Sequence, residues 1–311
     1  MKKTVMTTAW REASVPMPHT VLVILTPLLL VIDTVWCVIG HWTIVPQSLS
    51  ISVSVPVLLL TPLLCARYRH DERIRIMLTC TAHLILFCMA SLVLGCLIVS
   101  TNASLVDMRL ARWDLAMGFY WPDLFTWVKE RPLIDVVLDV AYVSTILQIT
   151  VVTLYLSYTR RFQALTDFVG LYATTLLATV IIGGVYPAAG PFKYYSGVVH
   201  ADASMLSHFE PLRSGALRSI DFFSAQGLVS IPSFHTIVAV LLMYAMRETR
   251  MRWLFILLNI LVIASTPTSG GHYLVDLIAG GFVAASAILM WNWRTVFYAG
   301  NRQLSVKYEG L

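Results

Sequence analysis

Eight apolar runs of membrane-spanning length constrain this chain more than any other feature. A helix needs about 20 apolar residues to cross a hydrocarbon core of about 30 Å. Such runs lie at about residues 20–41, 48–66, 76–100, 132–157, 166–186, 231–246, 252–268 and 272–292. Of the 311 residues, 58% are hydrophobic and 13% are charged, where a globular protein has about 25% charged. The sequence therefore predicts an all-α, polytopic membrane helical bundle of about eight transmembrane helices.

Basic residues gather in the short segments beside these runs. They lie at the N-terminus, after the second, fourth and sixth runs, and in the C-terminal tail. With eight spans, all five segments fall on one side, and basic short loops mark the cytoplasmic side. We expect a bacterial inner-membrane protein with both termini in the cytoplasm and with 101–131, 187–230 and 265–272 on the periplasmic, outer side. These loops account for the net charge of +5, so no nucleic-acid partner is indicated.

The segment 101–131 is not a span, because charges occur throughout it. Trp113, Trp121 and Trp127 lie among these charges. We expect an amphipathic helix in the outer interface, with the tryptophans as anchors. In the span that follows, Asp135 and Asp139 share a helix face at the level of the site described next, where they either border a cavity or make buried contacts between helices.

Two histidines, His235 and His272, stand at the outer ends of the sixth and eighth runs. Asp276 follows His272 by one helical turn, so its carboxylate can accept a hydrogen bond from that imidazole. Such a bond fixes the tautomer and makes the other ring nitrogen a better nucleophile or base. His235 is then free to act as an acid on a leaving group.

Both histidines follow segments that can hold an anion. Ser233 is expected to cap the helix that His235 opens, and the first turn of a helix offers unpaired N–H groups and a positive dipole end. The sequence SGG, which ends at Gly271, gives the last span a similar entrance. These features suit phosphoryl transfer through a phosphohistidine. Acyl transfer fits less well, because no serine has an evident base.

These motifs resemble those of a known family. IPSFHT at 231–236 and STPTSGGHYLVD at 265–276 resemble two motifs of the type 2 phosphatidic acid phosphatase superfamily. YPAAGPF at 186–192 and DLAMGFYWP at 114–122 are most similar to its branch of inositol phosphorylceramide synthases and their bacterial relatives. The resemblance implies an N-terminal two-helix addition at 1–70, a six-helix catalytic core at 71–295 and a cytoplasmic tail at 296–311.

The resemblance also implies roles. His272 would be the nucleophile, Asp276 its orienting carboxylate and His235 the general acid. Ser233, Gly271 and backbone amides would hold the phosphate.

The sequence departs from the superfamily in its phosphate-binding residues. Phe234 stands where the PSGH motif has glycine, Thr266 stands where the third motif has arginine, and the KxxxxxxRP motif is absent. A phosphate needs cationic partners. We expect them from the outer segment 187–230, with Arg213 first, then Arg218 and Lys193.

The expected function is that of a lipid-phosphate phosphatase or phosphotransferase. Its substrate would be a phospholipid or a polyprenyl (pyro)phosphate at the outer leaflet, and no cofactor or metal is expected. Transfer to water makes a phosphatase, and transfer to an alcohol such as inositol or a sugar makes a transferase; the sequence leaves this open. It does not indicate an oligomeric state.

Other functions are weighed against this one. An intramembrane serine protease would use Ser233 or Ser269, and a proton-coupled lipid transporter would use the histidines and aspartates as relays. A metal site of His235, His272 and Asp276 would have too few strong ligands.

Overall fold

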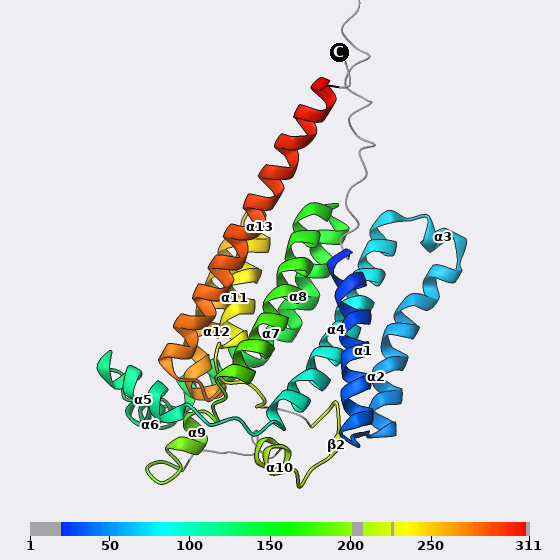
Figure 1. The fold of residues 1–311 in the computed structure, drawn as a ribbon. Coiled ribbons are helices and arrows are strands. Elements are labelled where there is room, and N and C mark those ends of the chain that lie inside the picture. The colour runs from blue at the N-terminus through cyan, green and yellow to red at the C-terminus, as the bar shows by residue number, and fades with distance from the viewer. Residues whose placement is uncertain (1–19, 201–207, 225–226, 309–311) are drawn as a thin grey trace, which may run out of the picture.

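The computed structural model describes residues 20–200, 208–224 and 227–308 as a bundle of long helices, with most of the short helices at one end (Figure 1). The long helices are α1 (Thr20–Ile39), α2 (Pro46–Leu60), α4 (Glu72–Val99), α7 (Pro132–Tyr158), α8 (Phe162–Val185), α11 (Phe234–Met246), α12 (Arg252–Ser269) and α13 (Leu274–Tyr308). The short elements are β1 (Thr43–Ile44), η2 (Thr61–Leu64), α3 (Ala66–Arg69), α5 (Asp107–Ala116), α6 (Trp121–Lys129), α9 (Pro191–Tyr194), α10 (Phe209–Ser214) and β2 (Ser219–Ile220).

The predicted helical membrane bundle is confirmed. Among the described residues, 7 helical segments are long and apolar enough to cross a membrane, and each coincides with a predicted run. The remaining run corresponds to α11, which has only 13 residues. At about 1.5 Å per residue, α11 reaches about 20 Å and does not cross alone.

The segment 227–233, buried or half-buried in the bundle, leads into α11. Pro232 has no N–H to donate and Ser233 caps the helix, so α11 begins at Phe234, as the predicted Ser233 cap requires and three residues after the apolar run begins. Irregular backbone at membrane depth is tolerated where protein covers it. This segment therefore takes the place of the first turns of a span.

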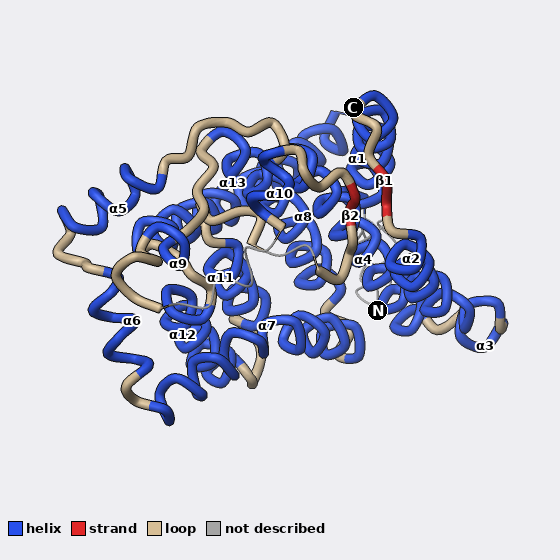
Figure 2. Tube along the Cα trace, turned by 90° about the horizontal axis from the view of Figure 1, so that it is seen from below, coloured by secondary structure: helices blue, strands red, loops and turns tan. Residues whose placement is uncertain are grey.

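The basic connections lie at one end of the bundle. In Figure 1, α3, the α7–α8 turn and the α11–α12 turn are all at the upper end. The elements α5, α6, α9 and α10 gather at the lower end, from which Figure 2 views the molecule. Successive described connections between the long helices therefore lie at alternating ends of the bundle, as expected for the eight predicted runs.

The segment 101–131 differs from the prediction. It forms two helices, α5 and α6, where a single amphipathic helix was expected. Trp113 and Trp127 are 54% and 46% exposed, as surface anchors would be. Trp121 is not an anchor: it is fully buried, and its Nε1 donates a hydrogen bond to the carbonyl of Pro267, 2.9 Å away. Trp121 therefore fastens α6 to the end of α12.

Polar side chains join the long helices inside the apolar core. Asn259 of α12 donates to Gln148 of α7 at 2.9 Å. Trp291 of α13 donates through Nε1 to Asp167 of α8 at 2.8 Å. Such interhelical hydrogen bonds add to the packing that holds membrane helices together. They fix α7 against α12 and α8 against α13, the helices that flank the predicted site.

The N-terminal pair α1 and α2 packs on α4 and is tied to the later chain at its lower end. Strands β1 and β2 pair in parallel, with Thr43 opposite Ser219 (Figure 2). The guanidinium of Arg218 lies 5.0 Å from the centre of the Trp42 ring. At the other end of the chain, α13 runs unbroken through residue 296 to Tyr308, so the start of the predicted tail falls inside a helix.

The crossing of α11 and α13 offers a matched test of this packing. A Cβ on Gly280 would lie 2.6 Å from the backbone oxygen of Ser233, whereas one on the adjacent Gly281 would meet no atom within 4 Å. We expect Gly280→Ala to destabilise the protein by about 1–3 kcal/mol, as overpacking does. Gly281→Ala should leave the thermal unfolding midpoint in detergent unchanged. An equal midpoint for the two variants would contradict this close packing.

Candidate active site

His272 and Asp276 form the predicted pair at the start of α13. The distance from His272 Nδ1 to Asp276 Oδ2 is 3.4 Å, and both side chains are buried. The same Oδ2 accepts bonds from the Ser230 hydroxyl at 2.8 Å and from the backbone N–H of Tyr273 at 3.0 Å. The carboxylate is thus held from three directions and faces one side of the His272 ring.

His235, at the start of α11, lies beside the same site. Its ring stacks on that of Tyr142 from α7, with centroids 4.0 Å apart and planes inclined by 23°. The position that a Cβ on Gly270 would take lies 2.8 Å from the Tyr142 ring and 3.0 Å from the His272 ring. Tyr142 therefore packs against His235 and also lies next to the segment that carries His272. Nothing in the sequence marked Tyr142 beyond its place one turn after Asp139.

The predicted anion-holding segment at Ser233 is joined through its backbone to the first turn of α13, and the one that ends at Gly271 packs on Phe192. Ser233 is the N-cap of α11, as predicted, and its Oγ accepts from the N–H of Thr236 at 3.4 Å. Its own N–H donates to the backbone oxygen of Asp276 at 3.0 Å. Gly271 has φ +62°, and a Cβ there would lie 2.5 Å from Phe192. Both the left-handed backbone and the contact require glycine at this position.

Two buried aspartates of α5 brace this site, and the sequence analysis did not single them out. Asp114 accepts from the N–H groups of Leu274 and Val275 at 2.8 and 2.9 Å, at the start of α13. Asp107 accepts from the Tyr273 hydroxyl at 2.9 Å.

Asp107 also accepts from the N–H groups of Ala189 and Gly190, which ties a second outer segment to the same brace. Burial raises the pKa of both carboxyls, and these hydrogen bonds partly offset the rise. The one sequence feature that could have identified Asp114 is its place in DLAMGFYWP.

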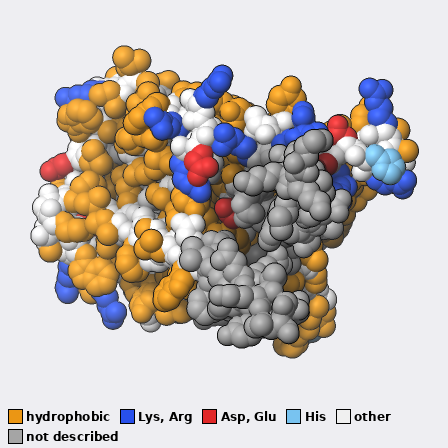
Figure 3. All heavy atoms as spheres, turned by 90° about the horizontal axis from the view of Figure 1, so that it is seen from above, with side chains coloured by type: hydrophobic (Ala, Val, Ile, Leu, Met, Phe, Trp, Pro, Cys, Tyr) orange, Lys and Arg blue, Asp and Glu red, His pale blue; other side chains and the backbone are white. Residues whose placement is uncertain are grey.

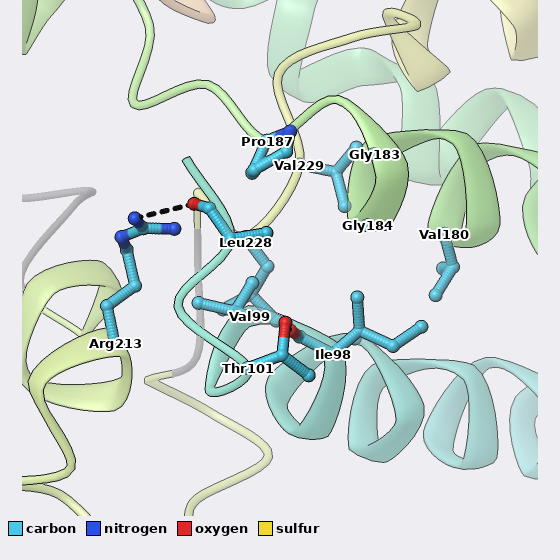
Figure 4. A pocket seen from close by; sticks show the side chains of 12 residues that line it. Ile98, Val99, Thr101, Val180, Gly183, Gly184, Pro187, Arg213, Leu228 and Val229 are labelled. Carbon is cyan, nitrogen blue, oxygen red and sulfur yellow. Dashed lines mark hydrogen bonds between the residues drawn. The ribbon is translucent and has the colours of Figure 1, made fainter. Parts of the chain in front are cut away.

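The three predicted phosphate-binding cations occupy other contacts. Lys193 of α9 pairs with Glu210 of α10. Arg218 lies over Trp42, as described above. Arg213 donates through Nη2 to the carbonyl of Ala103 at 2.8 Å, and Figure 4 shows it reaching toward the chain beside Thr101. Among the described residues, none of the three makes a polar contact with either histidine.

Arg213 also lines a small cavity with Val99, Leu228 and Val229 (Figure 4). Its volume of about 10 Å³ suits a single water molecule. The Nη1 atom of Arg213 is buried and has no partner among the described residues. This nitrogen can bind an anion only if the lining segments move apart.

The remaining acidic groups do not extend the site. Asp135 pairs with Lys129 of α6 at 2.7 Å, and Asp139 is exposed on the surface of α7. Neither borders a cavity among the pockets described. Within the described ranges, no group of three or more His, Cys, Asp or Glu side chains could hold a metal ion.

The fold and the site together define a polytopic helical membrane protein with two histidines and a buried carboxylate at one end of the bundle. A sequence model of the PAP2 superfamily matches residues 108–290. The chain therefore belongs to the PAP2 superfamily, that of the type 2 phosphatidic acid phosphatases. The match does not single out the inositol phosphorylceramide synthase-like branch. Searches of the curated proteins and of the solved structures return no match.

The brace from α5 yields a test of site geometry. In Asp114→Asn, an amide group faces two N–H donors, so one of the two bonds to the start of α13 is lost. A displacement of about 1 Å at His272 lowers kcat by about 10²-fold. We expect that loss on a lipid phosphate, with KM nearly unchanged. Asp123→Asn, on the exposed face of α6, is the control and should retain full activity. Equal activities in the two variants would show that Asp114 does not position the residues of the site.

Proposed function

We propose that this protein is a lipid-phosphate phosphatase or phosphotransferase that works through a phosphohistidine at His272. Membership of the PAP2 superfamily supports the coarser activity, an enzyme of phosphatase or phosphotransferase type acting on a lipid phosphate. The observation that carries the finer proposal is the pair of buried His272 and Asp276 with His235 beside it.

The proposed reaction has two steps. His272 attacks the phosphorus atom through Nε2, because Nδ1 faces Asp276. The bond from phosphorus to the lipid oxygen breaks, and His235 gives a proton to that oxygen. In the second step water or an alcohol attacks the phosphohistidine and returns a proton to His235. The buried Asp276 carboxylate stabilises the positive charge that forms on the His272 ring.

Backbone groups and a cation would hold the phosphate. The first turn of α11, after Ser233, and the N–H of Gly271 lie beside the histidines and offer donors to an anion. Arg213 is the preferred cation of the three, because its Nη1 has no partner among the described residues. We place the site at the outer leaflet, because the basic connections lie at the opposite end of the bundle.

Replacing the nucleophile tests the mechanism. We expect His272→Ala to lower the turnover of a labelled lipid phosphate by at least about 10³-fold, as loss of a nucleophile does. Brief reaction of the wild type followed by a denaturing quench in base should trap an acid-labile phosphoprotein that the variant lacks. His70→Ala, exposed at the opposite end, is the control. Full turnover by His272→Ala would contradict the proposed mechanism.

The fate of the phosphate separates the two activities. The wild-type protein is supplied with labelled lipid phosphate, with and without inositol or a sugar. A phosphatase releases inorganic phosphate at the same rate in every case. A transferase forms a new phosphate ester that depends on the alcohol concentration, and the label distinguishes the two products.

Arg213 and Arg218 can be separated by kinetics. If Arg213 binds the phosphate, Arg213→Gln raises KM by about 10-fold, which corresponds to the loss of one charge-assisted hydrogen bond. Arg218→Gln removes the contact with Trp42, so we expect a lower unfolding midpoint with KM within about twofold of the wild type. An unchanged KM in Arg213→Gln would show that Arg213 does not bind the phosphate.

A further inference from the structure

A second hollow lies at the end of the bundle opposite His272. The turns between α7 and α8 and between α11 and α12 border an open depression of about 690 Å³. Three arginines line this hollow, Arg161, Arg250 and Arg252, together with one carboxylate, Glu248. Figure 3 looks onto this end and shows basic side chains rising from an apolar surface. We call this feature the arginine hollow.

Within the described residues, no carboxylate forms an ion pair with Arg161 or Arg250 of the arginine hollow. Glu248 lies 3.5 Å from Arg247, which does not line the hollow. The side chains of Arg161 and Arg250 have no hydrogen bond or ion pair within the described part of the chain. Arg252 lies over the ring of Trp253 at 4.9 Å. The guanidinium groups therefore keep donors available, and their planar forks match phosphate oxygens.

The lower edge of the arginine hollow is apolar and faces outward. Trp253, 66% exposed, lines the hollow, and Leu254 and Leu257 follow it on the exposed side of α12. Leu154 of α7 is exposed as well. Tryptophan at this level is typical of the boundary between headgroups and acyl chains. A ligand that fits both parts carries a phosphate at one end and hydrocarbon at the other.

We propose that the arginine hollow binds the headgroup of an anionic phospholipid in the leaflet at the basic end of the bundle. The phosphate lies between Arg161 and Arg250, and the acyl chains descend along α7 and α12. Basic pockets between membrane helices on the cytoplasmic side are suited to such headgroups. The bound lipid joins the two turns and thereby stabilises the packing of α7 against α12. This site is separate from the reaction at His272.

The test compares two double variants of the full chain. Arg161→Gln with Arg250→Gln removes two charges from the arginine hollow. Arg67→Gln with Arg69→Gln removes two exposed charges from α3, at the same end but outside the hollow. Binding of phosphatidylglycerol and of phosphatidylcholine to the detergent-purified proteins is measured by native mass spectrometry, and the thermal unfolding midpoint is measured in parallel.

We expect the wild type and the α3 variant to retain phosphatidylglycerol and to gain thermal stability from it. The hollow variant should bind it about 30-fold more weakly, because the loss of each arginine weakens binding about fivefold. Equal weakening in both double variants would mean a diffuse surface effect and would overturn the proposal. The same holds if phosphatidylcholine binds as tightly. A stabilisation by inorganic phosphate alone that equals that of the lipid would reassign the hollow to a soluble anion.

Discussion

Backbone N–H groups that are buried away from water need hydrogen-bond partners, and this need determines how the segments before α11 and α13 are held. The segments 227–233 and 271–273 run without helical hydrogen bonds through a site that the bundle covers. An unsatisfied N–H at such a depth costs several kcal/mol. Asp114 and Asp276 supply acceptors to the start of α13, and the backbone oxygen of Asp276 serves Ser233. Buried carboxylates thus replace helical partners and fix the two histidine segments against each other.

The same arrangement joins the short helix α5 to the candidate site at the end of the bundle. The short helix α5 lies far from the histidines in sequence, yet its Asp107 and Asp114 accept bonds from the residues that follow His272. Side chains held in this manner are already positioned before a substrate binds. Such preorganisation is a main source of rate enhancement in enzymes. The helix α5 is therefore part of the candidate site, and the long helices alone do not define it.

Local features of the chain could be predicted from sequence, and long-range ones could not. The apolar runs, the Ser233 cap and the contact of His272 with Asp276 each depend on residues close in sequence. The contacts of Asp107, Asp114 and Trp121 join residues 82, 160 and 146 positions apart. A charged, tryptophan-bearing segment such as 101–131 therefore reads as an interfacial helix, although its key side chains point into the protein.

The parallel pairing of β1 with β2 makes the N-terminal helices hard to separate from the rest. Leu22 and Leu29 of α1 belong to the same core cluster as Phe87 of α4. A chain that began at residue 71 would present this apolar face of α4 to lipid and leave Ser219 and Ile220 without their strand partner. The N-terminal helices therefore act as a scaffold for the residues around β2 as well as for α4, and a shortened protein would lose both contacts.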